Sequence, residues 1–288
     1  MKLVLSRKGF DSQYGGFPSP IFPDGRILSL PIPSQHDRWT MGDVRWGDID
    51  PNHVLRDLTR GRFDSTTRVH LDPDLDRRMD RRLPGWRPSL GQTGSPQGHL
   101  SRQGVGAGDV FLFFGWFQHV KFNRGRWSYD HGSPGFHMMF GWLEVEFVLP
   151  LNGDRSNVIS ERPWLADHPH VAAPSHYTDP RNTIYGGREH SGLVTACAGG
   201  GVFNRFGEKL VLTKPGASRS IWRLPPWWYP QPGKRPLSFH ASPERWALDN
   251  GDCRLRTVGK GQEFVADDDS YPELKDWVSG IVSAHAGR

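Results

Sequence analysis

The stretch SRKGFDSQYGGFPSPIFPDG, residues 6 to 25, carries the densest set of side chains that could do chemistry. Its carboxylates, Asp11 and Asp24, could act as bases or bind a metal, and the ring of Tyr14 could stack on a nucleobase. Glycines and prolines restrict the backbone between them, which favours a fixed geometry over a flexible linker. The alternative is a turn-rich connection between two strands, whose acids cap local backbone groups.

Two cations begin the same stretch. Arg7 and Lys8 could hold the phosphates of a substrate, and the glycine pair that follows would let backbone N–H groups approach an anion. Because Asp11 and Asp24 share one loop with these cations, we interpret the stretch as part of a site.

A second polar motif, HLDPDL, spaces His70, Asp72 and Asp74 two residues apart. Side chains alternate along an extended chain, so these three would point to one side. They could bind a divalent metal or form a histidine base oriented by an acid. The His-x-Asp spacing is also similar to that of the non-heme iron oxygenases, which need a second histidine downstream. The candidates for it are His99, His119 and His137.

We rank acid–base use of this motif above metal binding, because an Asp-Pro pair more often marks a turn. We predict that Asp11 and Tyr14, supported by Asp24, meet His70 and Asp72 in one pocket. Carboxylates gathered near an imidazole shift one another's pKa values, so one group could accept a proton while another stays ionised. We assign no metal to this pocket, and the sequence identifies no cofactor.

Two further segments, GWRPSLGQTGSPQGHL and WRLPPWWYPQ, predict a surface that recognises a base. Amide and guanidinium groups read base edges, and aromatic rings stack on bases. Core packing of the aromatic residues and a solvated loop of polar ones are the alternatives. The residues that we assign to substrate binding here are Trp86, Arg87, Gln92, Gln97, His99, Arg219, Trp222 and Arg223.

The elements that must position these groups are mostly strands. The clearest are apolar runs at 109–119 and 137–148, and we expect Phe113, Trp116, Trp142 and Val145 to be buried in the core. A helix is predicted from Asp50 to Gly61, with Pro51 at its first position, and a second helix near the end of the chain. Residues 68–109 are predicted as a long loop. Further strands are predicted at 2–6, 26–33, 182–187, 201–206, 209–216, 236–241 and 253–266.

The predicted strands and the absence of a linker indicate one strand-rich α+β domain over residues 1–288, with a mixed or antiparallel sheet or a partial barrel and long polar loops.

The net charge is +5, and only 8 of the 36 basic residues are lysine. The excess of arginine over lysine has two explanations. Arginine recognises phosphate, and a codon bias of the genome would produce the same excess. Two cysteines and no long apolar run favour the cytoplasm and no membrane. No Walker A loop, G-x-G-x-x-G, G-x-S-x-G or Cys-x-x-Cys motif occurs.

The opening stretch, together with HLDPDL, LPGWRPSLGQTGSPQGHL, GVGAGDVFLFFGWF and FGWLEVEFVLP, resembles the bacterial and phage family called nucleotide modification associated domain, third type. That resemblance covers essentially the whole chain and implies a link with modification of DNA or nucleotide bases. Within it, GVGAGD before an apolar strand is similar to the core hairpin of PUA-like domains, which bind bases.

We therefore predict a protein that modifies a base in DNA or in a nucleotide, with acid–base chemistry from an Asp/His pocket and nucleic acid or a nucleotide as partner. The alternative is a non-catalytic PUA-like module that binds a base. Convergence of the acids and His70 in one cleft would favour an enzyme, and a concave aromatic face alone would favour a binding module.

Overall fold

The computed structural model describes residues 1–80, 82–151, 155–259, 261 and 263–286. Two long antiparallel strands, β7 (Val110–Asn123) and β9 (Phe136–Pro150), form its centre, as predicted. Leu112 on β7 lies opposite Trp142 on β9. The polar segment between them contains β8 (Arg126–Tyr129), which pairs back onto the end of β7.

The large sheet is mixed and curls into a half-barrel, which confirms the predicted α+β class. Its path runs β15–β1–β7–β9–β11–β10–β6, and only the pairings of β7 with β1 and β2 are parallel among those that the structure describes. The strands that join β7 and β9 in this sheet are β1 (Lys2–Arg7), β2 (Ser19–Ile21), β6 (Ser89–Gln92), β10 (Thr183–His190), β11 (Ala198–Val202) and β15 (Glu263–Asp267).

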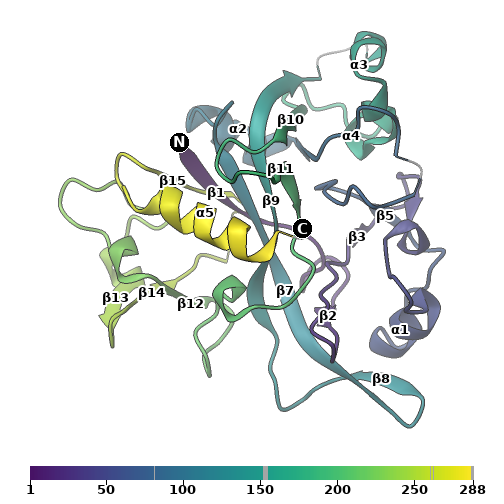
Figure 1. The fold of residues 1–288 in the computed structure, drawn as a ribbon, viewed down its shortest axis with the longest axis horizontal. Helices are drawn as coiled ribbons and strands as arrows, with labels where there is room; N and C mark the ends of the chain where they lie inside the picture. Colours follow the sequence, from purple (N-terminus) through teal and green to yellow (C-terminus); the bar gives the residue numbers. More distant parts are fainter. Residues whose placement is uncertain (81, 152–154, 260, 262, 287–288) are drawn as a thin grey trace.

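Two small sheets flank the large one, at the right and the lower left of Figure 1. The first contains β3 (Ile32–Pro33), β4 (Trp39–Thr40) and β5 (Arg68–His70), and the second contains β12 (Ile221–Leu224), β13 (Trp246–Asp249) and β14 (Asp252–Arg256). The α-helices are α1 (Pro51–Leu58), α2 (Gly94–Arg102), α3 (Ser156–Glu161), α4 (Pro169–Ala172) and α5 (Leu274–His285). Short 3-10 turns are η1 (Met41–Asp43), η2 (Pro163–Asp167), η3 (Glu208–Leu210), η4 (Pro226–Trp228) and η5 (Pro243–Arg245).

Both predicted helices form. Asp50 caps α1 by accepting the backbone N–H of Asn52, and Pro51 occupies the first helical position. The apolar face of α5 packs Val278 and Val282 into the main core. No helix in the described part of the chain is long and apolar enough to cross a bilayer.

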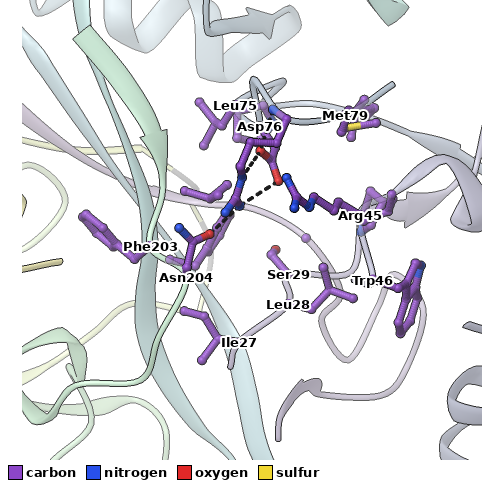
Figure 2. Close-up of a pocket in the computed structure, with 18 of the residues that line it drawn as sticks. Ile27, Leu28, Ser29, Arg45, Trp46, Leu75, Asp76, Met79, Phe203 and Asn204 are labelled. Carbon is purple, nitrogen blue, oxygen red and sulfur yellow. Dashed lines mark hydrogen bonds and ion pairs between the residues drawn. The ribbon is translucent and has the colours of Figure 1, made fainter. Parts of the chain in front are cut away.

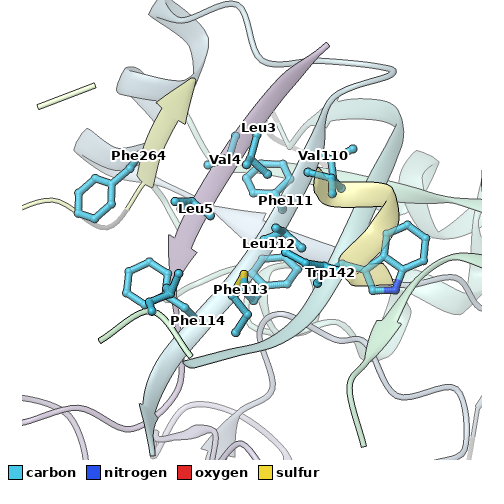
Figure 3. Close-up of a cluster of buried hydrophobic side chains, with 14 of the residues drawn as sticks. Leu3, Val4, Leu5, Val110, Phe111, Leu112, Phe113, Phe114, Trp142 and Phe264 are labelled. Carbon is cyan, nitrogen blue, oxygen red and sulfur yellow. The ribbon is translucent and has the colours of Figure 1, made fainter. Parts of the chain in front are cut away.

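The core of the large sheet is dominated by aliphatic and aromatic side chains from β1, β7 and β9 (Figure 3). Phe113, Trp142 and Val145 are buried as predicted, whereas Trp116 keeps part of its surface exposed. A second apolar cluster surrounds α1, and a third joins Trp86 to Trp164 and Val171 next to α4. The third cluster anchors the segment that carries several histidines.

Predictions of local structure are wrong for four segments. Residues 68–109 are not a continuous loop, because β5, β6 and α2 form within them. The apolar run at 26–33 forms only the two-residue strand β3, and Leu30 is instead buried beside Phe10 in the second cluster. The segments at 209–216 and 236–241 form turns and isolated bridges, although Leu210, Leu212 and Leu237 are buried in the core.

Candidate functional site

His70, Asp72 and His170 form a buried polar cluster. One ligand atom from each residue lies within 4.8 Å of the others. His70 ends β5, Asp72 follows it by two residues, and His170 lies on α4, so the cluster joins distant parts of the chain. The predicted pairing of His70 with Asp72 on one side is thus present, whereas Asp74 turns away to Arg82 and the indole N–H of Trp86. The chain leaves the extended conformation after β5, which ends the alternation.

The carboxylate of Asp72 is 3% exposed and is held on both oxygens. Oδ1 accepts the backbone N–H of Gly91 at 2.6 Å and lies 3.5 Å from Nε2 of His168. Oδ2 lies 3.9 Å from Nε2 of His70 and 3.9 Å from Nζ of Lys8. Burial opposes ionisation, but the nearby Nε2 of His168 and the charge of Lys8 outweigh it and lower the pKa of Asp72. The cluster therefore contains a buried anion.

The two imidazoles of the cluster are oriented through their Nδ1 atoms. Nδ1 of His70 lies 3.1 Å from Oδ2 of Asp37 and 2.8 Å from the hydroxyl of Tyr177. Nδ1 of His170 lies 2.6 Å from Oδ1 of Asn182. An amide oxygen only accepts, so the neutral ring of His170 carries its proton on Nδ1 and its lone pair on Nε2. Burial lowers the pKa of His170 to about 3, which keeps this ring neutral.

Gly91 lets Asp72 and His170 approach each other. A Cβ atom at this position would lie 2.3 Å from Cδ2 of His170 and 2.7 Å from its Nε2, which real side chains do not tolerate. The same residue donates its N–H to Asp72. A residue on β6 thus fixes the anion with its backbone and leaves room for the imidazole by having no side chain.

Lys8 connects this cluster to a second buried acid. Its Nζ lies 3.5 Å from Oε1 of Glu263, which also accepts a hydrogen bond from the Gln92 amide at 2.5 Å. Burial raises the pKa of Glu263 despite the nearby Lys8 charge. Lys8 is therefore an internal cation, and its predicted role at a phosphate would require the phosphate to enter the protein.

A cavity of about 270 Å³ lies beside the cluster, and Asp72 is one of the residues that line it. Figure 2 shows Arg45 pointing across this cavity toward Asp76. Arg78 pairs with Asp76 and donates a hydrogen bond to Asn204. The remaining walls are mostly apolar. They come mainly from residues 26–31, 44–47, 71–79 and 202–204, and include Leu28, Trp46, Leu71, Leu75, Met79 and Phe203.

The structure places Asp11, Tyr14 and Asp24 in local turns. Asp11 accepts the backbone N–H groups of Gln13 and Tyr14, each at 2.7 Å, and the ring of Tyr14 is 49% exposed. Asp24 accepts the backbone N–H and the side chain of Arg26. Among the described residues, none of the three forms a hydrogen bond or ion pair with His70 or Asp72, so their contacts do not form the single pocket that we predicted.

The predicted base-recognition residues are scattered. The rings of Trp86 and Trp222 are buried, which corrects the expectation of an exposed stacking surface. The side chains of Gln92, Gln97 and His99 are also mostly buried. Each side chain already has a protein partner: Trp86 donates to Asp74, Arg87 pairs with Glu146, Gln97 accepts from Tyr185, His99 contacts Ser238, Trp222 donates to His137, and Arg223 lies 4.0 Å from Asp252.

Arg7 and Arg219 lie near each other beside the opening segment. The guanidinium of Arg219 lies 4.0 Å above the ring of Trp116, and its pKa is lowered by burial and by the charge of Arg7, with Asp11 opposing. The side-chain Nε of Arg7 is buried and has no hydrogen-bond partner among the described residues. These two residues keep positive charge available for an anion.

Sequence reasoning missed the histidines of the segment HPHVAAPSHY. His168, His170 and Tyr177 from this segment complete the cluster, whereas none of the three downstream histidines that we considered contributes to it. His99 contacts Ser238, His119 packs on Phe206, and His137 accepts from Trp222. The visible signal was the density of histidines in a short tract, which is typical of metal sites.

Fold and site together define a strand-rich α+β protein with a buried imidazole–carboxylate cluster beside a cavity. The chain belongs to the family described as nucleotide modification associated domain 3, whose family model matches residues 2–267 and so includes every residue of the cluster. This membership gives it a role associated with nucleotide modification. No curated protein and no solved structure shows significant similarity to the chain. The PUA-like similarity suggested by GVGAGD is not shown by these comparisons.

Proposed function

We propose that this protein is an enzyme that modifies a nucleobase, in DNA or in a nucleotide, at the His70–Asp72–His170 cluster. The observation that carries the proposal is the position of Asp72, whose buried carboxylate belongs to the cluster while the residue also lines the cavity. Polar groups of this kind at the wall of a mostly apolar cavity are typical of active sites. Membership of the nucleotide modification associated family supports a base as the substrate.

The cavity supports a base as the group that enters. Leu28, Leu71 and Met79 offer apolar contacts to a planar ring, while Ser29 and Asn204 offer hydrogen bonds to its edge. Arg45 and Arg78 lie at the exposed rim of the cavity and could contact a phosphate bidentately. A nucleotide would thus place its base toward Asp72 and its phosphate toward solvent.

The cluster also supports acid–base chemistry. Nδ1 of His168 accepts the backbone N–H of His170, so Nε2, which faces Asp72, is the nitrogen that carries the proton. Lys8 adds an ammonium group on the other carboxylate oxygen. Proton donors therefore flank a buried anion, and a positioned group of this kind contributes about 100-fold or more to a proton-transfer step.

Longer nucleic acid would need contacts beyond the cavity, and we propose that Arg7 and Arg219 provide them. Phosphate binding releases counterions, so affinity for single-stranded or duplex DNA should fall as salt rises. Replacing both with glutamine should reduce that salt dependence. Binding that does not change with salt would contradict this part of the proposal.

The proposal is tested by mass spectrometry of nucleosides from cells that express the protein, the Asp72→Asn variant or neither. We expect a modified nucleoside only with the unaltered protein, in DNA or in the free nucleotide pool. If the pools are identical in all three while the purified protein binds a base in the cavity, the protein is a binding module and not an enzyme.

A further inference from the structure

We propose that His70, Asp72 and His170 bind a divalent first-row transition metal ion. The inference starts from the same cluster as the proposed function, but its test measures binding of the ion and does not need a known substrate. Two imidazoles and one carboxylate form a donor set that suits Fe²⁺, Mn²⁺, Co²⁺ or Zn²⁺ and leaves coordination positions open. The third ligand comes from α4, which the sequence alone did not connect to HLDPDL.

The separations of the donor atoms fit a site that closes slightly around an ion. The three ligand atoms lie within 4.8 Å of one another, and Oδ2 of Asp72 lies 3.9 Å from Nε2 of His70. A metal at about 2.0–2.2 Å from each ligand would require ligand atoms somewhat closer than the widest of these separations. Small rotations of the three side chains would supply that change.

The groups that contact Nδ1 of His70 and Nδ1 of His170 are of the kind that orient metal-binding histidines. A ligating imidazole almost always presents its other nitrogen to a carboxylate, a carbonyl oxygen or water, which fixes the ring. His70 faces the buried carboxylate of Asp37, with Nδ1 3.1 Å from Oδ2. His170 donates to the amide oxygen of Asn182. Both arrangements leave Nε2 for the ion.

Gly91 is the positioning residue of this site. Its N–H holds Oδ1 of Asp72, which leaves Oδ2 on the side of His70. Its missing side chain makes the space in which the His170 ring lies. A methyl group there would displace His170 without removing any ligand, so Gly91→Ala separates the geometry of the site from its composition.

Lys8 competes with the ion for Asp72. Its Nζ lies 3.9 Å from the same Oδ2 that would bind the metal, so its positive charge opposes a second cation there. Replacing Lys8 with methionine should tighten metal binding. A structural hydrogen-bond cluster with no metal would show no such gain.

The test is titration of the untagged, chelator-treated protein with Co²⁺, followed by calorimetry and visible absorption. We expect one ion per chain, with an absorption band of bound cobalt. Affinity should fall at least tenfold in His170→Ala and Asp72→Asn, and about 10- to 100-fold in Asp37→Asn, which changes only an outer partner. His119→Ala, a partly buried histidine outside the cluster, should bind as the unaltered protein does.

Gly91→Ala should weaken Co²⁺ binding while far-UV circular dichroism shows a folded protein. If that variant fails to fold, Asp37→Asn and Lys8→Met carry the test, because they are expected to change affinity in opposite directions. Failure of the unaltered protein to bind Co²⁺, or equal binding by His170→Ala, would overturn the metal site. Either result would leave the proposed function intact, because nucleoside modification is measured separately from Co²⁺ binding.

Discussion

The opening segment, residues 9–25, and the histidine segment, residues 168–177, are both polar and rich in turns. They differ in burial and in how far along the chain their partners lie. Asp11 and Asp24 accept hydrogen bonds from residues two or three positions away and remain near the surface. His168 and His170 are nearly fully buried and contact residues far away in the chain. The density of polar residues is therefore a weaker guide to a site than the distance over which they find partners.

The junction of the opening segment with β1 does contribute to the site. Lys8 reaches Asp72 and Glu263, and Gly9 lines the cavity together with Ser29. The stretch thus helps to build the cavity through its first residues and its backbone, while its carboxylates stabilise the turns. We therefore predict that substitutions of Lys8 and Gly9 lower the free energy of unfolding more than substitutions of Asp11 and Arg26.

The largest effect on stability is expected for Lys8→Met. The change leaves the buried carboxylates of Asp72 and Glu263 without their shared cation, and such losses cost about 3 kcal/mol of unfolding free energy. Arg26→Met is the matched control, because Arg26 pairs with acids at the surface and should cost less than about 1 kcal/mol. Urea unfolding of both variants measures this difference. Adding Glu263→Gln to Lys8→Met should restore part of the lost stability, because it removes one of the two unpaired carboxylates.

Between pH 7 and pH 5, acid should destabilise the folded protein through the buried imidazole of His137. Burial, with Arg219 and Arg7, lowers the pKa of His137 to about 3 from about 6.5 in the unfolded chain. The unfolded state therefore binds more protons between these values, and stability falls as the pH drops below about 6.5. At pH 5 this group alone costs about 2 kcal/mol relative to pH 7.

His137→Asn removes this titration and keeps an acceptor near the indole of Trp222, which now donates to Nδ1 of His137. Urea unfolding between pH 7 and pH 5 should show a shallower loss of stability in the variant, whatever its stability at pH 7. An unchanged slope would mean that His137 does not remain neutral in the folded protein.

Gly9→Ala should cost about 1–2 kcal/mol of unfolding free energy. Gly9 has a φ of +76°, and a Cβ atom there would lie 2.8 Å from Oγ of Ser29. Gly16 also has a positive φ, +84°, but the nearest atom to a Cβ would be Nη1 of Arg62, at 3.5 Å. Gly16→Ala should therefore lower the free energy of unfolding by less. Thermal unfolding compares the two variants: Gly9→Ala adds a steric conflict to backbone strain, whereas Gly16→Ala adds backbone strain alone.

Asp11→Ala should have the smallest effect, about 1 kcal/mol, because it removes the acceptor for two exposed backbone N–H groups. Asp11→Asn keeps an oxygen in the same place and should cost less still. An equal loss in Asp11→Asn and Asp11→Ala would show that the negative charge near Arg219, which both variants remove, matters more than the acceptor oxygen in the turn.

The sequence was sufficient to predict those helices and strands whose signals lie within a few neighbouring residues. The apolar runs of β7 and β9 and the Asp50–Pro51 start of α1 are readable because each signal lies within a few residues. Helix α2 was missed because Gly94, Pro96 and Gly98 lower its helix propensity, while burial of Leu100 stabilises it.

The candidate site was predictable only in part for the same reason. His70 and Asp72 share one motif, so their proximity follows from the sequence. His170 reaches them only because Trp164, Leu165 and Val171 pack against Trp86 and carry α4 to β5 and β6. That packing is tertiary, and no spacing of histidines in the sequence encodes it.

Asp72→Asn and Asp11→Asn distinguish chemistry at the buried cluster from chemistry at the opening loop. Both changes remove one negative charge and keep the shape of the side chain. Nucleoside modification should be measured per folded molecule for each variant, with the folded fraction taken from circular dichroism. We predict a loss of at least about 100-fold for Asp72→Asn and near-normal modification for Asp11→Asn. Full activity in Asp72→Asn, with loss in a folded Asp11→Asn, would contradict the account.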